Sequence, residues 1–300
     1  MAAEDPRFEE SPRFGSGDQS GAPTARRIVL GAQLRRLREA ADISRADAGY
    51  YIRGSDSKIS RMELGRVGFK ERDVADLLSL YGVNDEQERE QFLDMVRKSN
   101  ERGWWHRYSS TMPNWFQDYV GLEESASLIQ SYELQFVPGL LQTEDYARAV
   151  VSHGRPELMD AESERRVALR LQRQKVLTRQ GAPRLWAVVD ESVLHRPIGG
   201  HRVLREQVEH LLELTRQPNV TLQILPYHMS GYAAEGAFSI LRFAEPSLPD
   251  IVYIEHQSGA LYLDRVDELE VYGRIIDRLA VDAETPDRSR QLLSKFRQDA

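Results

Sequence analysis

The chain has 300 residues and a net charge of −7, with 41% hydrophobic and 29% charged residues, an ordinary composition for a globular protein of two domains. It contains no cysteine, which excludes disulfides, cysteine-ligated zinc fingers, iron–sulfur clusters and thiol catalysis. No run of about 18 apolar residues occurs, so a membrane-spanning helix is excluded. The first residues have no apolar segment typical of a signal peptide, and we expect a cytoplasmic protein.

Composition changes sharply along the first quarter of the chain. Residues 1–25 are rich in proline, glycine and charged side chains, so they are predicted to be a disordered tail. Residues 26–72 carry twelve Lys/Arg and six Asp/Glu, a net charge of +6, whereas the rest of the chain carries −13. A small basic module on an acidic body favours nucleic acid as a partner, and a solvated charged helix is the alternative interpretation.

Apolar residues at helical spacing predict four helices within residues 26–82. The first, over about residues 27–40, has an apolar stripe made of Leu30, Leu34, Leu37 and Ala41. Ser44 and Ser55 are predicted to cap the second and third helices, which are short and joined by a turn at Arg53-Gly54. Gly49 lies where these two helices would approach closely. This pattern is typical of a helix-turn-helix.

Residues 43–66, ISRADAGYYIRGSDSKISRMELGR, resemble the phage-repressor type of helix-turn-helix found in the XRE family. The match depends on the capping serines, their spacing and the Ser-x-Ile-Ser-x-x-Glu-x-Gly pattern over residues 57–65. Arg53 stands where the family has a turn glycine, Gly49 where it has an alanine, and Ala48 where it has a leucine. The resemblance implies an all-α domain that binds double-stranded DNA.

The resemblance also implies a role for each matching residue, against the alternative of surface polar side chains with no partner. Arg35 and Arg45 would contact phosphates, and the N–H groups at the helix start capped by Ser55 would favour another phosphate. The residues implied to face the major groove are Ser57, Lys58 and Arg61. Arg38 and Glu63 match the family's structural ion pair, which we expect to be partly buried.

Residues 83–120 are predicted to form a helical and aromatic junction. A charged helix from Asn84, with Gln87 as its capping partner, would run to about Ser99 and join the two parts of the chain. The tryptophans that follow would pack at the start of the second domain, with a ligand-stacking site as the alternative; they are Trp104, Trp105 and Trp115.

Residues 121–283 show helices alternating with strand-like runs, and a C-terminal helix is predicted over 284–300. The predicted strands are 185–189, 220–225, 237–243, 251–255 and 260–263. Their close spacing late in the chain indicates antiparallel pairing and an α+β domain. A long helix over 160–179 has Arg166, Arg170 and Arg173 on one face. We interpret that face as solvated, in preference to a second phosphate contact or a dock for an acidic partner.

Segments such as LIQSYELQFVPGLL, LWAVVDESVLHRPIGG and YGRIIDRLA resemble the large C-terminal domain of actinobacterial antitoxin-like (WhiJ-like) XRE regulators. The resemblance covers about residues 104–280. It implies a cytoplasmic transcription factor whose C-terminal domain receives a small, neighbour-encoded partner protein or a signal. It implies no ligand residues in that domain.

The sequence carries no P-loop, no Gly-x-Ser-x-Gly and no metalloprotease pairing of histidines, so we expect no enzymatic activity, no metal and no cofactor. The favoured function is a sequence-specific DNA-binding transcriptional regulator controlled through its C-terminal domain. One alternative is an antitoxin-like interaction module that sequesters its partner and binds DNA mainly for autoregulation. A ligand-gated repressor is a third interpretation, and a homodimer is one option for its assembly.

Overall fold

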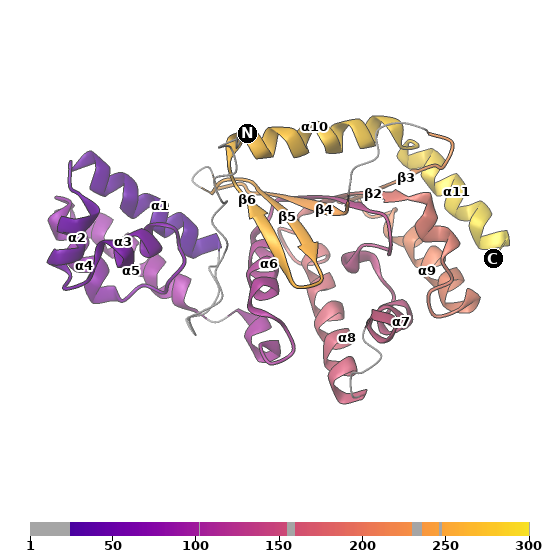
Figure 1. Ribbon diagram of the computed structural model, residues 1–300, viewed down its shortest axis with the longest axis horizontal. Coiled ribbons are helices and arrows are strands. Elements are labelled where there is room, and N and C mark those ends of the chain that lie inside the picture. Colours follow the sequence, from indigo (N-terminus) through magenta and orange to yellow (C-terminus); the bar gives the residue numbers. More distant parts are fainter. Residues whose placement is uncertain (1–24, 102, 155–159, 230–235, 246–247, 300) are drawn as a thin grey trace, which may run out of the picture.

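The computed structural model describes residues 25–101, 103–154, 160–229, 236–245 and 248–299. A helical N-terminal bundle stands beside a larger domain built on a sheet, as Figure 1 shows. The predicted tail lies outside the described residues, except for Ala25, which begins the first helix. An all-α domain followed by an α+β domain is the architecture predicted from the sequence, and it is confirmed.

The N-terminal bundle consists of α1 (Ala25–Ala40), α2 (Arg45–Tyr51), α3 (Asp56–Glu63), α4 (Glu71–Leu80) and α5 (Glu86–Asn100). Both predicted serine caps are present. Ser44 Oγ accepts from the N–H of Asp47 at 3.1 Å, and Ser55 Oγ accepts from the N–H of Lys58 at 3.2 Å. The apolar stripe of α1 meets the inner faces of α3 and α4 in one core.

Helix α5 belongs to this bundle and does not merely join two domains. Phe92 and Val96 are buried in the same core as Leu30 and Leu77, so the bundle extends to Asn100, beyond the predicted boundary at 82. Its cap is Asp85, one residue later than predicted, whose Oδ1 accepts from the N–H of Glu88 at 2.7 Å. The apolar stripe of α5 is narrow, which is why its charged sequence resembles a solvated connector.

The described strands of the C-terminal domain form one mixed sheet in the order β3-β2-β1-β4-β5-β6. Their bounds are β1 (Leu128–Glu133), β2 (Arg184–Asp190), β3 (Val220–Leu225), β4 (Phe238–Arg242), β5 (Ile251–His256) and β6 (Gly259–Leu263). The pairs β1–β2 and β2–β3 are parallel, because helices connect these strands. The pairs β1–β4, β4–β5 and β5–β6 are antiparallel, in agreement with the predicted pairing late in the chain.

Strand β1 lies between β2 and β4, yet its sequence did not predict a strand. The polar residues Gln130 and Ser131 interrupt its apolar pattern, but both are buried. Gln130 Oε1 accepts from Arg242 Nε of β4 at 2.7 Å, so a partner 112 residues away offsets the cost of its burial.

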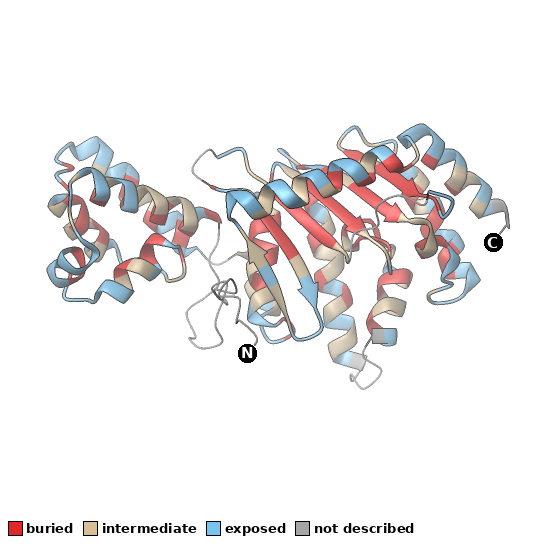
Figure 2. Ribbon diagram, turned by 45° about the horizontal axis from the view of Figure 1, so that its top comes forward, coloured by how far each residue is buried: buried red, intermediate tan, exposed pale blue. Residues whose placement is uncertain are grey.

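Helices cover the two faces of the sheet unequally (Figure 1). One face packs against α6 (Asn114–Ser125), α7 (Glu144–Gly154), α8 (Asp160–Gln174) and α9 (His201–Leu214). On the other face α10 (Val266–Asp282) crosses the strands, which are buried beneath it in Figure 2. Helix α11 (Pro286–Asp299) packs beside β3 and α9. In the part of the chain that the structure describes, no helix is long and apolar enough to cross a membrane.

The aromatic junction is packed, as predicted. Trp105, in the short helix η1 (Trp104–Tyr108), is 6% exposed and lies in a cluster with Val120 of α6 and Leu169 of α8. Trp104 Nε1 donates to Glu124 at 3.1 Å. The first turn of α1 reaches this domain as well, because Ala25 is buried in its main core.

Candidate nucleic-acid interface

The turn between α2 and α3 brings two helices unusually close together. A Cβ built on Gly49 would lie 2.7 Å from the carbonyl carbon of Ser55, so glycine at this position permits the approach. Arg53 adopts φ +53°, a left-handed conformation that costs a non-glycine residue about 1–2 kcal/mol. A glycine at position 53, as in the family, would relieve this strain. The departure from the family at Gly49 therefore permits a close approach of the helices, whereas the departure at Arg53 introduces strain.

Arg38 and Glu63 form a bidentate ion pair that holds the end of α1 against the end of α3. The two contacts are Nε to Oε1 at 2.5 Å and Nη2 to Oε2 at 3.1 Å. Their side chains are 10% and 7% exposed, which is deeper burial than we expected from the size of the domain. The hydrogen bond to Glu63 raises the pKa of Arg38, and Arg38 Nη1 also donates to the carbonyl of Ile43 at 2.8 Å.

Ser57 and Arg61 are both exposed and lie one turn apart on α3. Arg61 Nε donates to the carbonyl of Ser57 at 3.4 Å, so the arginine lies along the outer face of its own helix. Together with the first turn of α3, which Ser55 caps, they form a surface that can enter a groove and offer donors to base edges.

Lys58 differs from its predicted orientation toward the groove. Its Nζ lies 2.6 Å from Asp73 Oδ2 of α4, and its side chain is only 31% exposed. Asp73 lies in the first turn of α4, directly within reach of the lysine, so the charge is directed back into the bundle. The described geometry thus makes Lys58 a contact between helices.

Arg45 and Arg35 lie on the surface, and each already has an acidic neighbour. Arg45 Nε lies 3.3 Å from Asp56 Oδ1, and its Nη1 lies 3.5 Å from Ser60 Oγ, so Arg45 spans α2 and α3 beside the exposed face. Arg35 Nε pairs with Glu39 at 2.8 Å one turn along α1, and this hydrogen bond lowers the pKa of Glu39. A phosphate would compete with weak surface pairs at both positions.

Sequence reasoning missed two exposed aromatic side chains at the end of α2. Tyr50 is 87% exposed and Tyr51 is 50% exposed, immediately before the turn that leads to Ser55. Their positions, off the face defined by Ala48 and Ile52, were the signal available in the sequence. A tyrosine hydroxyl there can donate to a phosphate oxygen.

The predicted solvated arginine face of α8 is wrong for Arg173. This residue is 8% exposed, and it donates from Nε and Nη2 to Glu123 of α6 at 2.9 and 2.7 Å. Its guanidinium also lies over the rings of Phe116 and Tyr119. The face points inward because α8 packs against α6, and periodicity alone does not tell whether arginines on such a face find buried partners.

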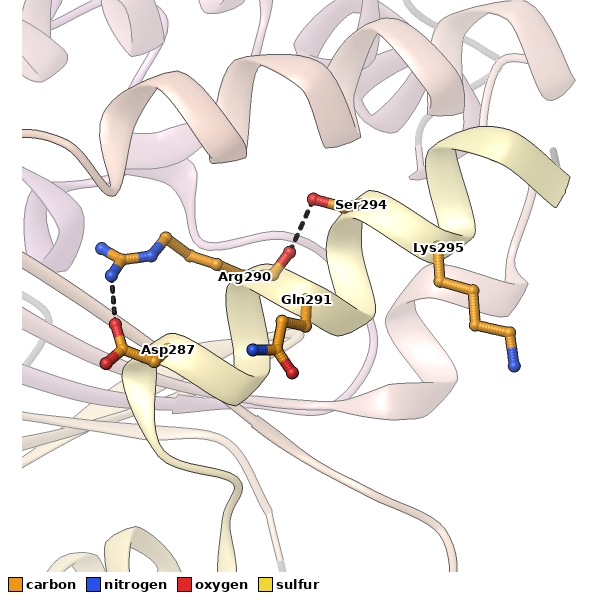
Figure 3. A pocket seen from close by; sticks show the side chains of 5 residues that line it. All are labelled: Asp287, Arg290, Gln291, Ser294 and Lys295. Carbon is orange, nitrogen blue, oxygen red and sulfur yellow. Dashed lines mark hydrogen bonds and ion pairs between the residues drawn. The ribbon is translucent and has the colours of Figure 1, made fainter.

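The C-terminal domain has a hollow on its surface that is lined by polar side chains. Figure 3 shows a shallow hollow along α11, lined by Asp287, Arg290, Gln291, Ser294 and Lys295. Arg290 pairs with Asp287, and Ser294 Oγ donates to the carbonyl of Arg290 at 2.9 Å, so these groups satisfy one another. Among the described residues, no group of three His, Asp or Glu side chains is arranged to hold a metal ion.

Comparison with known families gives two matches. A family model described as a helix-turn-helix domain matches residues 29–92, which span α1 to the start of α5. A second model, described as a domain of unknown function (DUF5753), matches residues 116–295, from α6 into α11. Comparison with curated proteins and with solved structures found no match.

Proposed function

Because the chain belongs to the DUF5753 family, and a DNA-binding helix-turn-helix domain precedes the DUF5753 domain, we propose that it is an XRE-type transcriptional regulator. It reads a specific DNA sequence with α3. Its C-terminal domain receives a small partner protein or a signal, and the chain needs no catalysis of its own.

The observation that carries this proposal is the outer face of α3. Ser57 and Arg61 are exposed on a helix whose first turn is capped by Ser55 and whose other end is held by the buried Arg38–Glu63 pair. Arginine offers the bidentate fork that suits guanine O6 and N7. A rigid helix with such a side chain on its free face is what direct reading of a base requires.

A selection of bound fragments from random DNA, made with the full chain, tests the proposal. We expect one preferred sequence. Replacing Arg61 by alanine should weaken binding to that sequence about 5- to 150-fold, as expected for a lost base contact of about 1–3 kcal/mol, and relax the preference at one base position. Arg45→Ala should weaken preferred and random DNA alike and reduce the salt slope by about one unit.

Arg165→Ala is the matched control, because Arg165 is exposed on α8 in the other domain. It should leave both affinities unchanged. Selection of no preferred sequence would contradict the proposal. Equal weakening of preferred and random DNA by Arg61→Ala would assign Arg61 to a phosphate and leave base reading to other residues.

The antitoxin-like alternative is favoured by the outer side of α10. Val266 is 72% exposed and Val281 is 76% exposed on the helix that crosses one face of the sheet. We propose, as a second candidate, that a neighbour-encoded partner is sequestered there and that DNA binding serves autoregulation. Co-expression with the neighbouring reading frame should then give a stable complex that Val281→Glu disrupts while DNA binding by the isolated chain is retained.

A further inference from the structure

A group of polar side chains lies at one end of the sheet, on the face covered by α6 and α8. Glu133 ends β1 and Glu255 lies near the end of β5. These two strand ends lie at the same end of the sheet, because both strands run antiparallel to β4. Both side chains lie on the helix-covered face, since they alternate with Tyr132 and Ile254 of the α10 face. Together with Arg170 of α8 and Ser131 of β1, they are called the polar cluster below.

The members of the polar cluster have unused hydrogen-bonding capacity. Glu133 makes no hydrogen bond or ion pair with the described residues. Among the same residues, Arg170 donates only from Nη1 to Gln142 Oε1, at 2.8 Å, and none of its nitrogens lies within ion-pair distance of Glu133 or Glu255. Ser131 is 4% exposed and its Oγ has no partner. Buried polar groups are normally paired, so the Oγ of Ser131 needs an explanation. Glu133 and Arg170 are half-buried, and Glu255 is exposed and accepts from the hydroxyl of Tyr253 at 2.9 Å.

The neighbouring Arg173–Glu123 pair shows what a closed pair looks like in this fold. Its two charges neutralise each other through two hydrogen bonds, and both side chains are buried. Arg170, in contrast, is close enough to Glu133 to lower the pKa of that carboxyl, yet too far away to pair with it. A ligand group that contacted both side chains would bridge this separation.

Charge in the polar cluster is set by its surroundings. Burial, followed by the charge of Glu255, raises the pKa of Glu133 to about 8, and burial beside Arg173 lowers the pKa of Arg170 to about 10. The charged and titratable groups facing Glu133 are Glu255 of β5, Arg170 and Arg173 of α8, and Tyr146 of α7. Without a ligand, Glu133 is therefore largely protonated at neutral pH.

The residue between the two acids across the sheet is small. Ala237 directly precedes Phe238, the first residue of β4, which pairs with Tyr132 of β1, so Ala237 lies between Glu133 and Glu255. Its side chain is a single methyl group, which keeps the two carboxyl groups from being separated by a bulky side chain of β4.

We propose that the polar cluster binds a small zwitterion with neighbouring ammonium and carboxylate groups, as in a free α-amino acid. Arg170 receives the carboxylate, Glu133 and Glu255 receive the ammonium, and Ser131 Oγ bonds a polar group of the ligand. An anion alone would meet two carboxyl groups, and a cation alone would meet Arg170. A molecule that carries both charges satisfies all of them.

Calorimetric titration of the full chain with each of the twenty free L-α-amino acids tests this inference, with acetate and methylamine as probes that carry one charge each. We expect at least one amino acid to bind at least about tenfold more tightly than either single-charge probe. Arg170→Gln and Glu133→Gln should each weaken that binding about tenfold or more. The matched controls are Arg165→Gln on α8 and Glu270→Gln on α10, both at exposed positions, which should bind as the original chain does.

Proton release gives a second measurement. The ammonium group favours the ionised form of Glu133, so binding near neutral pH should release a proton, and affinity should rise between about pH 6 and 8. In Glu133→Gln the proton release should disappear. Arg170→Lys keeps the charge but loses the planar fork, so it should bind with intermediate affinity and serves if Arg170→Gln does not fold.

The inference is overturned if no amino acid binds with a Kd below about 10 mM, if acetate or methylamine binds as tightly as the amino acid, or if the variants bind as the controls do. Binding itself does not depend on the proposed DNA function. DNA recognition is measured separately, with Arg61→Ala. Failure of one proposal can therefore be distinguished from failure of the other.

Discussion

Arg38 and Glu63 join the end of α1 to the end of α3, and both side chains are nearly buried. Removing one partner leaves the other charge without compensation in the core, at a cost of about 3–5 kcal/mol. We expect Glu63→Ala to lower the free energy of unfolding by about this amount. The Arg38→Ala, Glu63→Ala double variant should lose much less than the sum of the single losses.

Denaturant unfolding of the two single variants and the double variant measures this coupling. Arg35→Ala, which removes the exposed Arg35–Glu39 pair on the same helix, is the matched control and should produce no measurable loss. Additive losses at 38 and 63 would show that the two side chains contribute independently, despite their bidentate geometry.

Arg53 is a second site where a single residue carries strain. Its left-handed backbone costs about 1–2 kcal/mol, and a glycine would remove this cost. Part of the gain would be lost, because glycine has more conformational freedom in the unfolded chain. Arg53→Gly should therefore raise the stability of the bundle by about 0.5–1 kcal/mol. Thermal unfolding compares it with Arg53→Ala, which removes the same side chain and keeps the strain. An equal effect of the two substitutions would rule out the backbone explanation.

At the scale of the element, the position of α3 is set by its contact with α2. The approach at Gly49 leaves no room for a Cβ, since the nearest atoms belong to the backbone of Ser55 and Asp56. We expect Gly49→Ala to push the two helices apart and to destabilise the bundle by about 1–3 kcal/mol. It should also weaken DNA binding, because the capped start of α3 moves.

Unfolding and DNA titration of Gly49→Ala measure both effects. Ala46→Gly is the reverse control on the exposed face of α2, and it should lose only about 1 kcal/mol through helix propensity, without any defect in DNA affinity where the protein is folded. If Gly49→Ala were as stable as the original chain, the close approach would not constrain α3.

At the scale of the whole molecule, α1 contributes to both domains. Leu30 and Leu34 lie in the core of the bundle, whereas Ala25 lies in the core of the C-terminal domain. Arg27, between them, is buried and donates from Nε to the carbonyl of Ser99 at 3.1 Å. Asp118 of α6 acts electrostatically on Arg27. A change in the C-terminal domain can therefore reach the first helix of the DNA-binding unit directly.

Asp118 makes this contact sensitive to pH. Burial raises its pKa to about 8, well above the value near 4 expected in the unfolded chain, and its Oδ1 has no hydrogen-bond partner. The folded protein therefore holds a proton that the unfolded chain releases, so its stability falls as pH rises from about 4 to 8. Asp118→Asn should match the original chain near and below pH 4 and become progressively more stable than it toward pH 8.

Unfolding at a series of pH values checks this prediction, with Asp277→Asn on the exposed side of α10 as the control. The titration of one carboxyl changes the free energy of unfolding by at most about 1.4 kcal/mol per pH unit. A constant difference between Asp118→Asn and the original chain at all pH values would mean that Asp118 does not titrate in this window.

The helix-turn-helix was predicted from the sequence because its determinants are local. Capping serines act over three residues, the apolar stripe repeats within one helix, and the tight turn follows directly from the spacing of Ser44 and Ser55. The same locality made the antiparallel pairing of the last three strands predictable, because β4, β5 and β6 follow one another closely in the sequence.

Contacts between distant residues decided the rest. Strand β1 is buried because Gln130 meets Arg242, Lys58 turns away from the groove because Asp73 is within its reach, and the arginine face of α8 closes on Glu123. The sequence by itself determined which helices form and which charges they carry. Only the tertiary structure decided which of those charges are free, because burial and pairing depend on neighbours that no local spacing specifies.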